Sequence, residues 1–384
     1  MNILFVNRLL GTYWGGGESF TYNAAKTMSK MGHKSLILST RLMFEKTPVV
    51  SDVDIEYIRM PYLRKFGYML QGKLPKVPSL IMQADSLLFS RMAYSWIKEN
   101  IGRFDVIQLT SLTYLAEMIL NRLGKPVVLR FPGPPSEKWH LPALRRLGSN
   151  PRALVFGAGD AVIKSEKMGI HMKNIPQGVD TGIFNTDYNE RAKIRSKYGI
   201  KDSDFLLFSC ARLINGKGLE FLINGFCKAN VKIPGLKLVI AGDGVLFNKL
   251  RNMIKKLKLQ NEIFLSGFVP HDELYKYYSA ADAYVLLSYY ENFSNTVLEA
   301  MACGLPVITT DVGGFPLQVE NGKNGFLIPY GNKNAFVSSV YRIYSDISLR
   351  KSMGETNRSC VKSGYRWEKT AERLLELYKK VTDA

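Results

Sequence analysis

Short apolar runs alternate along this chain with segments whose apolar residues recur at helical spacing. The runs are rich in Val, Ile, Leu and Phe, which predicts buried parallel strands joined by amphipathic helices. In the first half, strands are predicted at residues 2–7, 35–40, 54–60, 105–110 and 126–131, with helices at 23–31, 84–97 and 112–123. In the second half, strands are predicted at 205–210, 236–242, 262–268, 283–288, 306–310 and 325–329, with helices at 221–228, 246–256, 272–279 and 297–303.

A break in this pattern divides the chain. Residues 175–189 are rich in Gly, Pro, Asn and Asp, as expected of a connection between domains. A chain of 384 residues also exceeds the usual size of a single core. We therefore expect an α/β protein of two doubly wound domains that face each other across a cleft. Ligands of such sheets bind beyond the carboxyl ends of the strands.

The composition narrows the class of protein. With 46% hydrophobic and 22% charged residues, the chain is neither disordered nor fibrous. No run is long and apolar enough to cross a bilayer, and no signal peptide is recognisable at the N-terminus. The four cysteines lack metal-type spacing, which favours reduced thiols in a cytoplasmic protein. The net charge of +19 favours an acidic partner such as anionic lipid or a phosphorylated substrate, although a merely basic surface would explain it equally well.

The strongest candidate site follows the strand predicted at 283–288. A polar loop containing Glu291 leads into a helix that begins near Ser294 or Asn295, and Glu299 lies more than one turn inside that helix. The amides of the first turn, at Ser294, Asn295, Thr296 and Val297, would attract a phosphate. The two carboxylates could then bind neutral hydroxyls on either side of a diphosphate. An ordinary strand–loop–helix with two solvated glutamates is the simpler alternative.

A second candidate follows the strand predicted at 205–210. Arg212 and Lys217 lie on one loop, which suits a diphosphate, and Gly216 and Gly218 would let the backbone bend around it. The loop is not a Walker A sequence. A basic surface turn is the alternative.

Weaker candidates lie in the first half of the chain. The glycines of residues 15–17 could admit a phosphate or sugar near backbone amides, although their spacing does not fit a dinucleotide fold. Asp52 and Asp54 resemble a metal-binding pair but have no further ligands nearby, so a solvated turn is preferred. His140, in a Pro-rich loop, is a minor candidate for catalysis; His33, His171 and His271 suit structural or surface roles. No metal site is predicted.

Residues 57–84 contain no acid, while basic residues there alternate with Tyr, Phe, Met and Leu. This mixture suits contact with an anionic membrane surface, and equally a basic loop packed on the core. Single-stranded nucleic acid would also fit, but only the charge supports it, so no nucleic-acid partner is expected.

At these residues the sequence resembles the family 4 retaining glycosyltransferases of GT-B fold. The resemblance lies in the Glu-x7-Glu spacing of Glu291 and Glu299, in ARLINGKG, IAGDG, GLPVITTDVGG and NGKNGFLIP, and in the closing helix YRWEKTAERLLELY. It is dense from about residue 176 onward and thinner before.

The resemblance implies a role for each matching residue. Arg212 and Lys217 would bind the donor diphosphate, Glu291 the hydroxyls of the transferred sugar, and Glu299 the ribose hydroxyls. The donor site would also include Gly17, Ser294, Asn295, Thr296, Val297, Gly242 and Phe268. The family retains the anomeric configuration and needs no metal or other cofactor. Charge developing on the departing diphosphate would be stabilised by the cations and the helix amides.

Two positions depart from the family pattern. The family has Glu in its Gly-Gly-x-Pro-Glu segment, where this chain has Leu317 after Gly313-Gly314-Phe315-Pro316. The family also tends to have His after the strand at 126–130, where this chain has Arg130-Phe131-Pro132-Gly133. The first departure affects expected sugar contacts, and the second leaves the role of that His altered or taken by His140.

The resemblance implies three segments: an acceptor-binding domain at 1–180, a nucleotide-sugar donor domain at 181–364, and a helix at 365–384 that packs back on the first domain. The predicted activity is transfer of a hexosyl-type sugar from a UDP- or GDP-sugar to a hydroxyl of a glycan or lipid-linked glycan, in cell-surface polysaccharide biosynthesis, in the cytoplasm or at the cytosolic membrane face. The alternatives are a nucleotide-sugar epimerase or phosphorylase of the same fold and a catalytically degenerate donor-binding protein.

Overall fold

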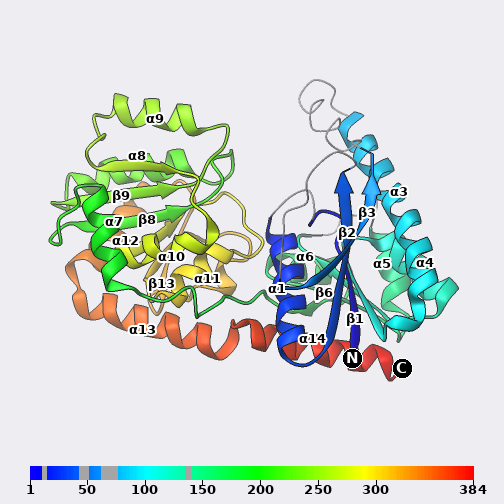
Figure 1. The fold of residues 1–384 in the computed structure, drawn as a ribbon. Helices are drawn as coiled ribbons and strands as arrows, with labels where there is room; N and C mark the ends of the chain where they lie inside the picture. Colours follow the sequence, from blue (N-terminus) through cyan, green and yellow to red (C-terminus); the bar gives the residue numbers. More distant parts are fainter. Residues whose placement is uncertain (11–14, 43–51, 62–76, 135–139) are drawn as a thin grey trace. The chain divides into compact units, whose positions relative to one another are not determined.

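A computed structural model describes residues 1–10, 15–42, 52–61, 77–134 and 140–384. The chain divides into two compact units (Figure 1). Unit 1 comprises residues 1–178 and 367–384, and unit 2 comprises residues 179–366. The first unit is thus built from two separate stretches of the chain.

Unit 1 contains a parallel sheet of order β3-β2-β1-β4-β5-β6-β7. Its strands are β1 (Asn2–Val6), β2 (Lys34–Leu42), β3 (Asp54–Met60), β4 (Val106–Thr110), β5 (Val127–Phe131), β6 (Ala153–Gly157) and β7 (Lys173–Asn174). Its helices are α1 (Gly16–Lys30), α3 (Val77–Asn100), α4 (Thr113–Leu123), α5 (Leu141–Gly148), α6 (Asp160–Lys167) and α14 (Trp367–Thr382), with a 3₁₀ turn η1 (Ile101–Arg103).

Alternate residues of these strands enter two separate cores. Leu4 and Val6 of β1 face α3, α4 and α5, whereas Ile3 and Phe5 face α1 and α14. Side chains of a strand point alternately to opposite faces, so a sheet covered on both sides must be apolar at every position. This explains why the strands read as continuous apolar runs in the sequence.

Helix α14 follows unit 2 in the chain but belongs to the core of unit 1. Leu374 and Tyr378 are fully buried there, and the Tyr378 hydroxyl donates to Oε1 of Gln108 on β4 at 2.5 Å. The Thr370 hydroxyl donates to the carbonyl of Pro176 at 3.1 Å. The predicted return of the C-terminal helix to the first domain is therefore confirmed.

Unit 2 contains a parallel sheet of order β10-β9-β8-β11-β12-β13. Its strands are β8 (Phe205–Cys210), β9 (Leu236–Ala241), β10 (Ile263–Gly267), β11 (Ala283–Leu286), β12 (Val307–Thr310) and β13 (Gly325–Ile328). Its helices are α7 (Tyr188–Lys197), α8 (Leu219–Asn230), α9 (Phe247–Lys256), α10 (Leu274–Ala280), α11 (Asn295–Ala302), α12 (Lys333–Ser345) and α13 (Ile347–Gly364), with 3₁₀ turns η2 (His271–Glu273) and η3 (Phe315–Leu317).

The sheet of unit 2 is likewise covered on both faces. Helices α8, α9 and α12 pack on one face, and α7, α10, α11 and α13 pack on the other. The fold is therefore the predicted α/β class, two Rossmann-like doubly wound domains. Every predicted strand is present.

Some helices differ from their predicted extent. Helix α1 was expected from residue 23 but begins at Gly16. Glycines have poor helix propensity, so the helical pattern starts late in the sequence; burial of Phe20 in the core extends the helix toward the N-terminus. Helices α5, α6, α7, α12 and α13 and strand β6 were not predicted, because these segments are short or mostly polar.

Candidate active site

The predicted residues of unit 2 lie at one edge of its sheet. Strands β8 and β11 are neighbours, yet the strands that follow each of them extend the sheet in opposite directions. This reversal opens a crevice beyond the carboxyl ends of the two strands, where ligands of such sheets bind. The loops that follow β8 and β11 carry Arg212, Lys217 and Glu291.

These two loops are joined directly. Nζ of Lys217 lies 2.5 Å from Oε2 of Glu291, and both side chains are largely buried. The amide of Tyr289 donates to the carbonyl of Gly216 at 2.7 Å. The two charged side chains singled out from separate motifs therefore form one ion pair, which fixes the orientation of both.

Two glycines allow this close approach. A Cβ on Gly218, which has φ +66°, would lie 1.7 Å from the carbonyl oxygen of Leu287. A Cβ on Gly313, with φ +55°, would lie 2.1 Å from the carbonyl oxygen of Glu291. The amide of Gly314 donates to that same oxygen at 2.8 Å. The Gly-Gly pair thus supports the backbone of the loop that carries Glu291.

Helix α11 begins beside this ion pair. Ser294 is its N-cap, and its hydroxyl accepts from the amide of Val297 at 3.4 Å. Among the described residues, the amides of Asn295 and Thr296 have no hydrogen-bond partner. They remain available to an anion at the positive end of the helix.

A residue that the sequence did not indicate holds the N-cap in place. The Gln318 side chain accepts from the amide of Ser294 and donates to its carbonyl, both at 2.8 Å. Gln318 is buried, whereas the neighbouring Leu317, at the position of the family's Glu, is exposed. Gln318 is distant in sequence from α11, so no local pattern identifies it.

Glu299 is buried within α11 and is bound through both oxygens. Oε1 lies 2.9 Å from Nε2 of His271, and Oε2 accepts from the Tyr278 hydroxyl at 2.8 Å. Desolvation of the His271 ring lowers its pKa, but the hydrogen bond and charge of Glu299, with Asp272 and Asp180, outweigh it, so the pKa is raised. The assignment of His271 to a merely structural or surface role missed this contact.

The remaining predicted residues of unit 2 lie along the same edge. Arg212 is exposed just after β8. Gly242 follows β9, where a Cβ would lie 1.9 Å from the carbonyl oxygen of Ala211, and its amide donates to Gly267 at 2.8 Å. Phe268 follows β10 and is 75% exposed, which is unusual for so large an apolar side chain.

Candidates in unit 1 are placed as follows. Gly17 is the second residue of α1, and its carbonyl accepts from Nδ2 of Asn7 at 3.3 Å. The His140 ring packs against Phe131, and burial lowers the pKa of His140. Asp52 forms an exposed ion pair with Lys26. Most of the basic and aromatic residues of segment 57–84 fall at 62–76, outside the described residues.

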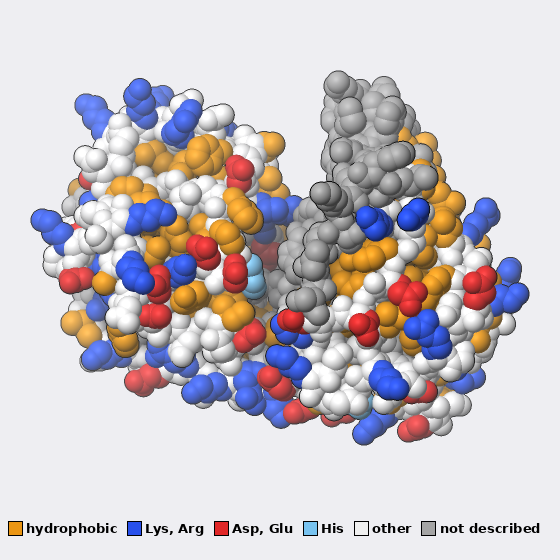
Figure 2. Space-filling model, in the orientation of Figure 1, with side chains coloured by type: hydrophobic (Ala, Val, Ile, Leu, Met, Phe, Trp, Pro, Cys, Tyr) orange, Lys and Arg blue, Asp and Glu red, His pale blue; other side chains and the backbone are white. Residues whose placement is uncertain are grey.

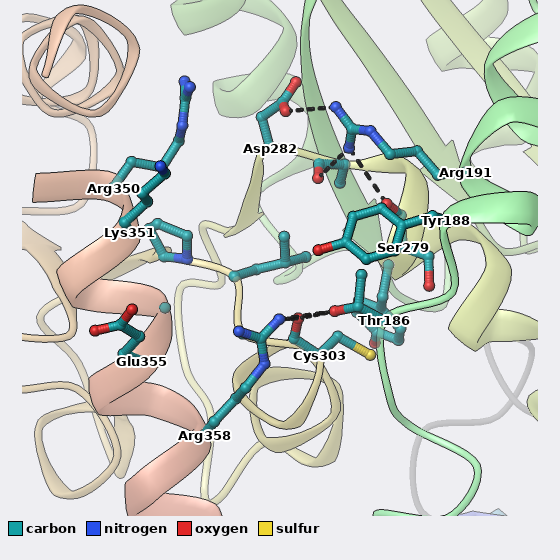
Figure 3. A pocket seen from close by; sticks show the side chains of 16 residues that line it. Thr186, Tyr188, Arg191, Ser279, Asp282, Cys303, Arg350, Lys351, Glu355 and Arg358 are labelled. Atoms are coloured by element: carbon teal, nitrogen blue, oxygen red, sulfur yellow. Dashed lines mark hydrogen bonds and ion pairs between the residues drawn. The ribbon is translucent and has the colours of Figure 1, made fainter. Parts of the chain in front are cut away.

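A cavity of about 230 Å³ lies at the opposite edge of the unit 2 sheet (Figure 3). It is bordered by Asp282 and Pro306, which precede β11 and β12, and by α13. Arg191 pairs there with Asp282 at 2.9 Å, and Arg358 donates to the Thr186 hydroxyl at 2.8 Å. Because it adjoins the amino ends of the strands, this cavity is not the crevice that doubly wound sheets use for ligands.

Two searches of the described residues gave no candidates. No three His, Cys, Asp or Glu side chains are arranged to hold a metal ion. No helix in the described ranges combines the length and apolarity needed to cross a membrane. On the face in Figure 2, Lys and Arg are dispersed among Asp and Glu.

Two units, each a doubly wound parallel sheet, define the GT-B fold. The sequence model of the family described as "Glycosyl transferases group 1" matches residues 190–360, which lie within unit 2. The Anabaena protein HepE, solved in complex with UDP, has this fold with a TM-score of 0.76 at 20% identity, over 98% of this chain and 99% of that one.

Two curated relatives differ in how much they share. An uncharacterised glycosyltransferase of Methanocaldococcus jannaschii is 31% identical over 54% of each chain. The N-acetyl-alpha-D-glucosaminyl L-malate synthase of Bacillus anthracis is 24% identical over 95% of this chain and 93% of its own length. The chain therefore spans about half the length of the first relative and nearly all of the second.

Proposed function

We propose that this protein is a retaining, metal-independent glycosyltransferase that moves a hexosyl-type sugar from a nucleotide diphosphate donor to a hydroxyl of a glycan or lipid-linked glycan. The observation that carries the proposal is the meeting of Lys217, Glu291 and the N-terminus of α11 at the switch point of unit 2. The family match over the same residues supports it.

Each group has a task in this proposal. Lys217, Arg212 and the amides of Asn295 and Thr296 bind the diphosphate and stabilise the charge that develops as it leaves. Glu291, held by Lys217, accepts hydrogen bonds from hydroxyls of the transferred sugar. Glu299 retains lone pairs beyond those used by His271 and Tyr278, and with them it accepts from the ribose hydroxyls. Gly242, Phe268 and Gly17 complete the donor site.

The donor is proposed to be a UDP- or GDP-sugar. The Anabaena neighbour, solved with UDP and with UDP-glucose, motivates the choice of UDP-glucose as the first donor to test. The acceptor is proposed to bind unit 1, and the bacillary relative acts on L-malate by its name, so small acids belong in the acceptor panel.

The test is donor turnover in Lys217→Met and Glu299→Gln. We expect Lys217→Met to lower the transfer rate by about a hundredfold, because a cation at the leaving group is lost. Glu299→Gln should raise the donor KM by about tenfold with a smaller change in kcat. Lys249→Met is the matched control: Lys249 is an exposed lysine of the same unit, paired with Glu220 at 2.8 Å. Equal rates in all three variants would reject the site.

Stereochemistry and metal dependence are tested with the same assay. The proton NMR coupling of the new anomeric centre should match that of the donor, and excess chelator should leave the rate unchanged. Inversion would reject the proposed mechanism. A donor-derived product formed without any acceptor would favour an epimerase, and donor binding without turnover would favour a degenerate binding protein.

We further propose that the protein works in the cytoplasm at an anionic membrane face, reached through residues 57–84. Leu80 and Leu87, seven residues apart on α3, are exposed apolar side chains adjoining this basic segment. Sedimentation with vesicles containing anionic lipid should bind the protein, and replacing Arg64, Lys65, Lys73 and Lys76 with Ser should release it. Equal binding to neutral vesicles would reject an electrostatic contact.

A further inference from the structure

The edge of the unit 1 sheet beyond β1 and β4 is the switch point of that unit. Strand β1 pairs with β2 on one side and with β4 on the other, and α1 begins just after β1. The N-cap of α1 is Gly15, which offers no side-chain hydrogen bond, and Gly16 in the first turn is exposed. The first amides of α1 are therefore open to a ligand.

A buried cation faces this helix end. Arg130, on β5, is 92% buried, and its Cζ lies 3.9 Å from the ring centroid of Phe20. Its Nη1 has no hydrogen-bond partner and lies 3.7 Å from the point that a Cβ on Gly17 would occupy. A larger residue at position 17 would thus press on the guanidinium.

A guanidinium in this position is costly for the protein. Desolvation lowers the pKa of Arg130 to about 9, and the charge of Glu18 offsets only part of that effect. A buried cation with an unsatisfied N–H normally persists only where another group completes it. Glu18 lies in the first turn of α1, so its carboxylate also offsets the positive end of the helix.

The surrounding groups hold this site open. Asn7 and Thr21 both donate to the carbonyl of Gly17, at 3.3 and 3.1 Å, which fixes the peptide that follows it. Ser111, at the end of β4, has the rare φ of +56°, and its amide donates to the carbonyl of Arg130 at 2.9 Å. The polar groups around Arg130 are thus engaged with each other, while Nη1 and the first amides of α1 are not.

We infer that Arg130 and the first turn of α1 form an oxyanion-binding site in unit 1, which takes a carboxylate or phosphate group of a substrate. A planar guanidinium with helix amides beside it is suited to such a group. This inference rests on the proposed function for the identity of the substrate, because the same chemistry is supplied by an acid group on the acceptor or by the donor diphosphate.

The test uses the whole protein with inorganic phosphate and UDP as probes, followed by calorimetry and thermal unfolding. Wild type should be stabilised by phosphate, and Arg130→Met should weaken phosphate binding by about tenfold or more, because a charged hydrogen-bonding partner is lost. Arg130→Lys should keep part of the response. Arg146→Met, which removes an exposed arginine paired with Glu117, is the control for net charge and should bind phosphate as wild type does.

Stability without ligand separates a binding role from a structural one. Without phosphate, Arg130→Met should melt at or above the wild-type temperature, because an unsatisfied buried charge is removed. A lower melting temperature for Arg130→Met, or equal phosphate binding in Arg130→Met and wild type, overturns the inference.

Competition identifies the source of the anion. If saturating UDP leaves the Arg130-dependent phosphate response intact, the site serves an acid group of the acceptor; if UDP abolishes it, the site serves the donor diphosphate. Loss of UDP binding in Lys217→Met with an intact phosphate response separates the two sites. Failure of the Arg130 variants to alter phosphate binding leaves the proposed transferase standing, whereas absent turnover with an Arg130-dependent phosphate response removes the transferase and keeps the anion site.

Discussion

Glu299 binds two side chains that differ in how they respond to pH. The Tyr278 hydroxyl donates at any ordinary pH, since burial raises the Tyr278 pKa well above its usual value. His271 attracts the carboxylate fully only when protonated. The orientation of Glu299 is therefore constant, whereas the charge beside it depends on pH.

This difference gives a prediction for His271. Its pKa in the folded protein is raised, so its contribution to stability is fully present below the unfolded value of about 6.5 and is lost as pH rises through the folded pKa. The melting temperature of wild type should exceed that of His271→Gln most below pH 6.5, and the difference should shrink above the folded pKa. Thermal melts across pH 5.5 to 9 measure this.

Histidine NMR provides the control. The chain has four histidines, so the His271 resonance can be assigned by substitution. In Glu299→Gln the pKa of His271 should fall, because desolvation remains while the main attraction is removed. An unchanged pKa would show that Glu299 is not the cause.

Residue-scale contacts of this kind could be predicted only in part. The Glu291 and Glu299 spacing, Lys217 and the Ser294 cap follow from local sequence, and the structure places them at one edge. His271 and Gln318 lie 28 residues before Glu299 and 24 residues after Ser294. Nothing local marks such partners, because only the folding of intervening helices brings them together.

At the scale of single elements, the loop between β8 and α8 depends on glycine for two different reasons. Gly216 has φ +90° with open space around it, whereas Gly218 has φ +66° and touches the backbone at Leu287. The first requires only an unusual backbone conformation, and the second also requires the absence of a side chain.

The pair permits a matched experiment. Gly216→Ala should cost about 1 kcal/mol of unfolding free energy through backbone strain alone. Gly218→Ala should cost about 3 kcal/mol or more, because its Cβ would collide with a carbonyl that cannot move freely. Urea unfolding of the two variants compares them, and equal costs would contradict the contact with Leu287.

The start of α11 gives a second prediction at this scale. Gln318→Ala should cost about 2–4 kcal/mol, because the amide and carbonyl of Ser294 both lose their buried partner. Leu317→Ala, at the exposed neighbouring position, should change stability by less than about 0.5 kcal/mol. Urea unfolding measures both, and similar losses in the two would argue against the side-chain clamp at Ser294.

Helix boundaries were the least predictable part of the elements. Strand positions follow from apolar runs that must be buried on both faces, so they are readable from the sequence. The start of α1 at Gly16 is decided by packing of Phe20 against Phe156 and Trp367, at 5.8 Å between ring centroids in each case. Trp367 is distant in sequence, so this boundary is set by tertiary contacts.

At the scale of the whole molecule, α14 completes the core of the unit that starts the chain. Its buried residues pack on β1, β4, β5 and α1. Residues 1–178 alone would expose that apolar face to water, at a cost of about 25 cal/mol for each Å² of apolar surface.

A fragment experiment follows from this arrangement. Residues 1–178 should bind a dye for exposed apolar surface and aggregate, and a peptide of residues 365–384 added in trans should reverse both effects. Residues 179–366 should fold cooperatively by themselves, because both of their cores are internal. A cooperatively folded 1–178 fragment without the peptide would contradict the role assigned to α14.

The place of α14 in the chain also sets an order of events on the ribosome. The polypeptide that begins unit 1 leaves the exit tunnel first, but the helix that closes its core is translated only after all of unit 2. Unit 2 can mature while the nascent N-terminal half still has a bare apolar flank. Chaperones that recognise such surfaces therefore have their longest opportunity on the segment made earliest, the reverse of the usual N-to-C sequence of domain folding.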